Sequence, residues 1–176
     1  MSSPSTYSEW VNLLDSFAEG NETSINFLET GSFVVDAGTA SRFYTRVEET
    51  YKKRKKKWLD NFQKSFDFSG IKRIDDFEIS LRNGKQNLLP IYRFVNLSGL
   101  PDDLKKVLGR DLVDFVAEIK ITLKNNVSKI NSERDKMMIM LSSFDLPVIQ
   151  TTNPISSSKE KDNNKTEPGN GRKILF

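Results

Sequence analysis

The sequence predicts an all-α fold: a helical bundle with two long helices, at about 40–67 and 103–143, and several shorter ones. Apolar residues recur every three to four positions along most of the chain, which is the spacing of a helix with one buried face. Residue types that cap and end helices flank these runs. The chain has 176 residues and is therefore long enough for one domain with a buried core.

The first forty residues predict two short helices. Thr6 and Glu9 form the Thr-x-x-Glu pattern of a capping box, and the apolar residues that follow share one helical face as far as Gly20. A second short helix is indicated from Ile25 to its stop at Gly31.

The segment 40–67 predicts the first long helix. Large apolar residues mark its buried face: Phe43, Val47, Tyr51, Trp58, Phe62 and Phe66. Six consecutive cations interrupt that face: Lys52, Lys53, Arg54, Lys55, Lys56 and Lys57. They occupy every side of the helix, and burying an unpaired cation costs several kcal/mol. We therefore expect this stretch, the basic segment, to lie in solvent or to face acidic groups.

The segment 76–97 allows two interpretations. Two helices with a break at Gly84 or Asn87 are favoured. The alternative is a small β-hairpin that turns at Asn83 and Gly84. Pro90 would then stand inside the return strand, where it cannot donate to the hydrogen-bond ladder.

The second long helix, 103–143, is predicted from an apolar residue at nearly every helical turn as far as Phe144, with Gly109 as a place where the run kinks or divides. Further apolar residues widen the stripe between Leu112 and Leu123: Val113, Val116, Ala117 and Ile121. We expect this portion to be the most buried in the protein. Pro147 ends the helix.

The composition changes after the helices, so we expect a helical domain at 5–148 and a disordered tail at 149–176. Residues from 151 onward are mostly Ser, Asn, Lys, Glu, Pro and Gly, and such a segment cannot bury enough apolar surface to fold. The tail ends in a basic and apolar tip: Arg172, Lys173, Ile174, Leu175 and Phe176.

Charge is distributed in blocks. The first 41 residues hold six acids and no Lys or Arg, whereas residues 42–66 hold nine bases and three acids. Three interpretations of the basic segment follow. The acidic block neutralises it within the molecule, it contacts nucleic acid or another polyanion, or it is a nuclear import signal.

Catalytic chemistry finds little support. The chain has no Cys and no His, which excludes disulfides, thiolate nucleophiles and the side chain that titrates nearest to neutral pH. No phosphate-binding loop, dinucleotide fingerprint or nucleophile motif occurs. Asp111, Asp114 and Glu118 share a helix face that could present oxygen ligands to a cation, but the adjacent Arg110 and Lys120 favour a solvated face. We expect no enzyme, no cofactor and no metal site.

The sequence thus predicts a non-catalytic protein–protein interaction module, such as an adaptor, a regulator or a subunit of a larger assembly. Its tip, 172–176, would be a tethered docking peptide for a partner protein, or would fold back onto its own domain. The alternative function is nucleic-acid binding through 52–57. Without a signal peptide or an apolar run long enough for a membrane span, we expect no membrane partner and a cytoplasmic location, or a nuclear one in a eukaryote.

Overall fold

The computed structural model describes residues 4–31, 33, 36–66, 73–130 and 133–146. These residues form six helices and no strand, which confirms the all-α class. The helices are α1 (Tyr7–Ala18), α2 (Thr23–Thr30), α3 (Ala37–Ser65), α4 (Ile74–Val95), α5 (Asp102–Val127) and α6 (Arg134–Ser142). The expected tail, 149–176, lies outside the described residues.

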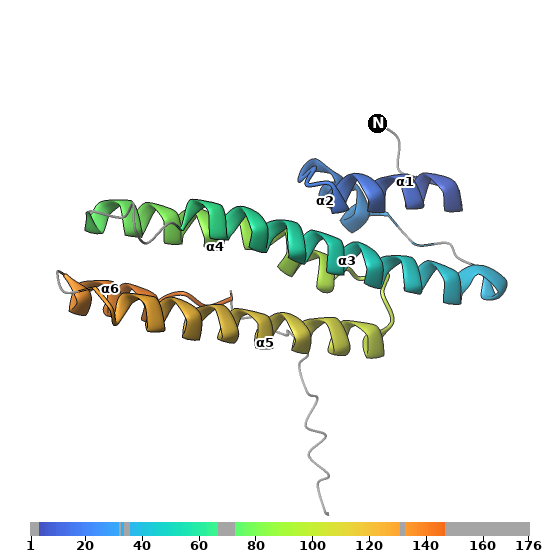
Figure 1. Ribbon diagram of the computed structural model, residues 1–176. Helices are drawn as coiled ribbons and strands as arrows, with labels where there is room; N and C mark the ends of the chain where they lie inside the picture. The colour runs from blue at the N-terminus through green and yellow to red at the C-terminus, as the bar shows by residue number, and fades with distance from the viewer. Residues whose placement is uncertain (1–3, 32, 34–35, 67–72, 131–132, 147–176) are drawn as a thin grey trace, which may run out of the picture.

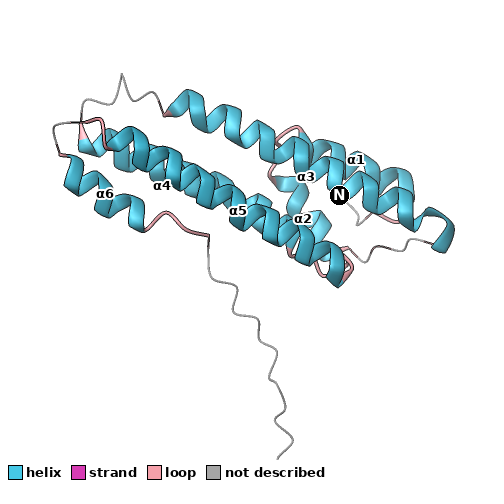
Figure 2. Cartoon of the chain, turned by 60° about the horizontal axis from the view of Figure 1, so that its bottom comes forward, coloured by secondary structure: helices cyan, strands magenta, loops and turns pink. Residues whose placement is uncertain are grey.

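The three longest helices, α3, α4 and α5, run side by side and in alternating directions (Figures 1 and 2). The short helix α1 lies along the N-terminal half of α3, and α2 connects this corner to α4. The last helix, α6, folds back along α5 and also contacts α4. The result is an elongated bundle with α1 and α2 at one end and α6 at the other.

Local capping explains where the first helices begin. Thr6 and Glu9 form the predicted capping box: the Thr6 hydroxyl accepts from the Glu9 amide at 3.3 Å, and the Glu9 carboxylate accepts from the Thr6 amide at 3.0 Å. The first long helix begins at Ala37, slightly earlier than expected, because the Asp36 carboxylate caps it by accepting from the Thr39 amide at 2.9 Å.

Helix α4 confirms that the segment 76–97 is helical and excludes both the expected break and the hairpin alternative. It is one continuous helix through Gly84 and Pro90, with neither a break nor a hairpin. Gly84 is buried where α4 meets α3: a Cβ atom on it would lie 2.3 Å from Cε2 of Phe62. The indole N–H of Trp58 donates to the Gly84 carbonyl at 3.1 Å. The glycine therefore permits a close approach of two helices and does not mark a turn.

The second long helix is shorter than predicted. It ends at Val127, and α6 is a separate helix that runs back along it. Glu133 precedes α6 with φ of 57°, a left-handed conformation that a continuous α-helix excludes. The apolar spacing continues across this break because both helices turn an apolar face to the same core, with Met137 and Leu141 buried on α6. Periodicity alone cannot reveal such a reversal.

The core is rich in aromatic residues. Phe17 of α1 stacks on Phe94 of α4 with ring centroids 4.8 Å apart, and Trp58 stacks on Phe62 within α3 at 4.7 Å. The widest part of the apolar stripe on α5, in contrast, is not the most buried part of the protein. Val113 and Ile121 are each 58% exposed, so the expectation for this portion was wrong.

Candidate interaction surfaces

The basic segment lies in the middle of α3, and its six cations do not share one environment. Arg54 is only 7% exposed, whereas Lys52, Lys53 and Lys56 are exposed. Arg54 lies three residues after Tyr51 and four before Trp58, both of which are buried, so it shares their core-facing side. The expectation that the whole segment faces solvent or acids was therefore incomplete, because Arg54 packs in the interior.

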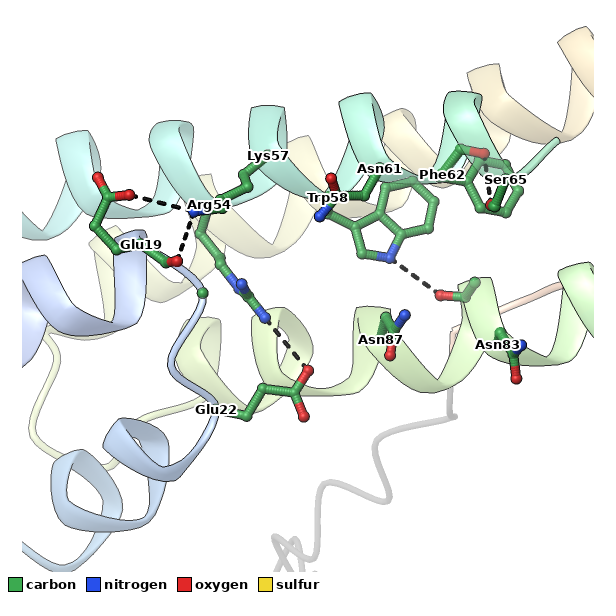
Figure 3. Close-up of a pocket in the computed structure, with 12 residues that line it drawn as sticks. Glu19, Glu22, Arg54, Lys57, Trp58, Asn61, Phe62, Ser65, Asn83 and Asn87 are labelled. Carbon is green, nitrogen blue, oxygen red and sulfur yellow. Dashed lines mark hydrogen bonds and ion pairs between the residues drawn. The ribbon is translucent and has the colours of Figure 1, made fainter. Parts of the chain in front are cut away.

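Among the described residues, Arg54 has one long ionic contact. Its guanidinium lies over the ring of Phe17, with Cζ 5.4 Å from the ring centroid. Figure 3 shows its other contact, in which Nη2 reaches Glu22 Oε1 at 3.5 Å. Its Nε is buried without a hydrogen-bond partner among the described residues. Burial lowers the pKa of Arg54, although the negative charge of Glu22 opposes that shift. Gly20 makes room for it: a Cβ there would lie 2.8 Å from Nη1, and its φ of 99° suits glycine.

Lys57 and Arg54 both line a polar hollow of 380 Å³ between α3 and α4 (Figure 3). Its ammonium donates to the Glu19 carbonyl at 2.6 Å and to the Glu19 carboxylate at 3.2 Å. The remaining polar side chains of the lining are Asn61, Ser65, Asn83 and Asn87. Two cations face two carboxylates here, so the hollow has no charge excess that would attract an ion of either sign.

Lys55 and Tyr51 both bind Asp111 of α5. The tyrosine hydroxyl donates to the carboxylate at 2.5 Å, and the Lys55 ammonium donates to the same oxygen. Burial alone would raise the pKa of Asp111, but these two hydrogen bonds and the positive charge of Lys55 outweigh it, so that pKa is lowered. Burial and the neighbouring carboxylate raise the pKa of Tyr51. Asp111 thus ties α5 to α3.

The acidic first helices neutralise part of the cationic charge of α3. Glu19 and Glu22 pair with Lys57 and Arg54, and Asp15 pairs with Arg46 at 2.5 Å. These contacts support the intramolecular interpretation for Arg46, Arg54 and Lys57. No carboxylate of the described residues comes within 4.0 Å of the Lys52, Lys53 or Lys56 ammonium groups, although Lys53 and Lys56 line a hollow together with Glu19 and Asp60. These three lysines form an exposed cationic patch.

A second surface was missed by the sequence analysis. It is an apolar hollow of 390 Å³ between the C-terminal end of α4 and the first half of α5, which we call the α4–α5 hollow. Apolar and aromatic side chains supply most of its wall: Tyr92, Val95, Leu112, Val113 and Leu146. Gly109 also lines it, and a Cβ at that position would meet no atom within 4 Å. Helix α5 runs unbroken through Gly109, so the expectation that the run kinks or divides there was wrong. A glycine inside a continuous helix is the sequence signal that could have indicated this hollow.

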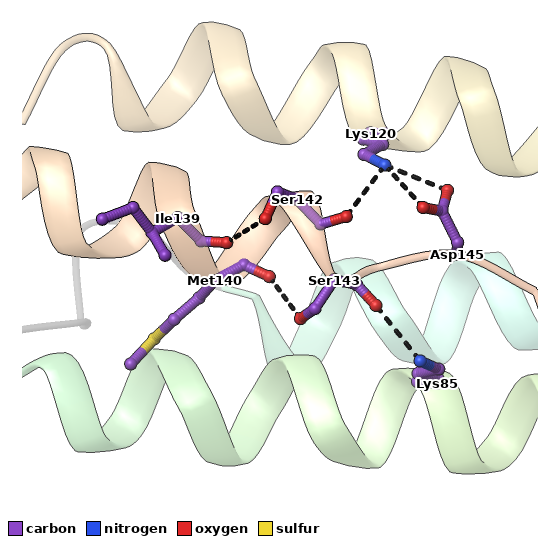
Figure 4. A network of polar contacts seen from close by, with 7 residues as sticks. All are labelled: Lys85, Lys120, Ile139, Met140, Ser142, Ser143 and Asp145. Atoms are coloured by element: carbon purple, nitrogen blue, oxygen red, sulfur yellow. Dashed lines mark hydrogen bonds and ion pairs between the residues drawn. The ribbon is translucent and has the colours of Figure 1, made fainter.

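Two lysines hold the chain segment that brings Leu146 to this hollow. Lys85 of α4 donates to the Ser143 carbonyl at 3.1 Å, and Lys120 of α5 binds the Asp145 carboxylate at 2.9 and 3.0 Å (Figure 4). Figure 4 shows the two ammonium groups reaching the end of α6 from neighbouring helices. The wall formed by Leu146 is thereby fixed relative to α4 and α5.

The other predicted features have simple outcomes. The tip, Arg172 to Phe176, lies outside the described residues. Within the described part of the chain, no three carboxylates are grouped so that they could hold a metal ion. Among the described helices, none combines the length and apolar character needed to cross a lipid bilayer.

Comparison with known proteins finds no match: no protein-family model, no curated protein and no solved structure matches the chain.

Proposed function

We propose that the chain is a non-catalytic protein-interaction module, acting as an adaptor, a regulator or a subunit of a larger assembly. The observation that carries this proposal is the α4–α5 hollow, which is apolar, open to solvent and unfilled by any described side chain. Apolar concavities that a protein leaves unfilled favour ligand or partner binding, because filling them removes apolar surface from water.

The surrounding helix supports the same function. Val113 of α5 is a large apolar side chain that is 58% exposed. Isolated exposed apolar residues are common on monomers, but Val113 is continuous with the wall of the hollow. The tip at 172–176, with its apolar Ile174, Leu175 and Phe176, would add a second, tethered contact to a partner.

Native co-purification tests this function. The tagged complete chain, purified gently from its source after nuclease treatment, is expected to bring down a reproducible protein partner that chemical cross-linking joins to it. A variant that lacks Ile174, Leu175 and Phe176 is expected to keep the melting temperature and to recover less of that partner. Recovery of nucleic acid alone, abolished by nuclease treatment, would contradict the proposal.

The exposed lysine patch favours nucleic-acid binding as a second candidate function. Lys52, Lys53 and Lys56 project from one side of α3 without an ion pair to a described carboxylate. Cations of this kind bind phosphates by releasing counterions, which makes the affinity fall steeply with salt.

A charge-matched comparison tests the second candidate. Replacing Lys52, Lys53 and Lys56 with Gln should weaken binding to a generic DNA duplex. It should also reduce the slope of log affinity against log salt by about 0.9 for each phosphate that the variant no longer neutralises. The control replaces three other exposed lysines, Lys64, Lys124 and Lys129, with Gln. Equal effects of the two triple variants in a fluorescence anisotropy titration would exclude the patch as the binding site.

A further inference from the structure

We propose that the α4–α5 hollow binds an acidic segment of a partner protein that inserts one large apolar side chain beside Gly109. This inference rests on the proposed interaction function and adds to it the site and the chemistry of the partner. Three features of the hollow carry it: the glycine in its wall, its rigid apolar lining and the charge of its rim.

No contact or backbone conformation of the described residues requires a glycine at position 109. A glycine inside a helix costs about 1 kcal/mol relative to alanine. The buried Gly84 is explained by its contact with Phe62, and Gly20 by its positive φ and by Arg54. Gly109 lies inside the first half of the 26-residue helix α5, and a Cβ on it would meet no atom within 4 Å. Its one consequence here is that the α4–α5 hollow stays open.

The lining is apolar and held in place. Val95 and Leu112 are buried side chains of α4 and α5, so their positions are set by the core behind them. Leu146 follows Asp145, which Lys120 binds. The volume of 390 Å³ lies at the low end of the range for ligand sites, about 300–1,000 Å³. Such a space suits one or two apolar side chains and does not suit a whole helix.

The rim has a single sign of charge. Three charged side chains line the hollow, and all are cationic: Lys105, Lys106 and Arg110. Lys105 and Lys106 have only loose ionic contacts, at 3.8 Å to Asp102 and 4.0 Å to Asp103. Arg110 has no ion pair to a described carboxylate. Carboxylates of a partner would complement this rim and steer its approach.

Charge also decides whether the hollow fits an external partner or the chain's own tip. Arg172 and Lys173 stand directly before Ile174, Leu175 and Phe176, so the tip would bring two cations to a cationic rim. An apolar residue flanked by Asp or Glu has the complementary pattern. The occupant that this hollow fits best is therefore an acidic segment of another protein.

A selection from a displayed random-peptide library, with the complete chain as target, tests the inference. The enriched peptides are expected to carry one Leu, Phe or Trp flanked by Asp or Glu. Their affinity, measured by fluorescence anisotropy, should fall about tenfold or more for Gly109→Leu, which fills the hollow. The peptide affinity should also fall when Lys105, Lys106 and Arg110 are replaced with Gln, and the affinity of that variant should depend less on salt concentration.

Val107→Leu is the matched control, because Val107 is 63% exposed on the same helix and does not line the hollow. It should leave peptide affinity unchanged, and circular dichroism should show that Gly109→Leu keeps its helices. Enrichment of basic peptides, or equal binding by Gly109→Leu, would overturn the inference. So would a large gain in peptide affinity on removing Ile174–Phe176, since that would make the tip the occupant.

The outcomes separate this inference from the function on which it rests. If co-purification finds a protein partner and Gly109→Leu recovers it in full, the hollow is not the docking site, but the interaction function stands. If acidic peptides bind the hollow and co-purification yields no protein partner, the chemistry of the site stands and the interaction function fails.

Discussion

Phe94→Ala is expected to lower the free energy of unfolding by about 3–5 kcal/mol, as truncation of a buried aromatic residue does. Phe94 is fully buried on α4, and its ring stacks on Phe17 of α1 with an interplanar angle of 12°. The pair joins the acidic N-terminal corner to the central helices. Removing one ring leaves a cavity there and also reduces the buried apolar area, and both effects destabilise the fold.

A double-mutant cycle makes this prediction specific. Phe17→Ala should cost a similar amount, and the double variant should cost less than the sum, by about 0.5–1.5 kcal/mol for the ring contact. Ile139→Ala is the control: Ile139 is 71% exposed on α6, so its effect should stay within about 0.5 kcal/mol. Urea unfolding followed by circular dichroism measures all four variants. A loss of stability for Phe94→Ala no larger than the control's would show that α1 does not pack on α4.

Helical periodicity predicted the fold class because each helix buries one face. The spacing of apolar residues along the sequence reveals such a face without any knowledge of how the helices pack. The capping box at Thr6 was predictable for the same reason, since all its partners lie within one turn. Whether a helical segment is one continuous helix or two was harder to predict. Gly84 and Asn87 suggested a break in α4, which is in fact one continuous helix, whereas the reversal before α6 left the apolar spacing intact.

In the basic segment, the position of each cation around the helix matters in addition to the number of cations. Six adjacent cations were conspicuous in the sequence, but only the spacing of Arg54 from Tyr51 and Trp58 places it on the buried face. Its pairing with Glu22 depends on how α1 and α2 pack, which no local pattern encodes. The α4–α5 hollow depends on three separate elements, so its lining could not be assembled from the sequence.

The same substitution at two glycines is expected to give opposite changes in stability. Gly109→Ala should raise the free energy of unfolding by about 1 kcal/mol, because alanine is the better helix former and its Cβ meets no atom within 4 Å. Gly84→Ala should lower it by about 1–3 kcal/mol, the usual cost of overpacking. The added methyl group would lie 2.3 and 2.6 Å from two ring carbons of Phe62.

Phe62 cannot easily give way at Gly84. Its ring stacks on Trp58, and Trp58 in turn donates to the Gly84 carbonyl, so moving either ring strains a buried hydrogen bond. Relief would require α3 and α4 to separate, which would loosen the centre of the bundle. Both variants gain the same intrinsic helix propensity, so the difference between their unfolding midpoints in urea reports the contact with Phe62 alone. A stabilising effect of Gly84→Ala would show that α3 and α4 do not approach closely at this position.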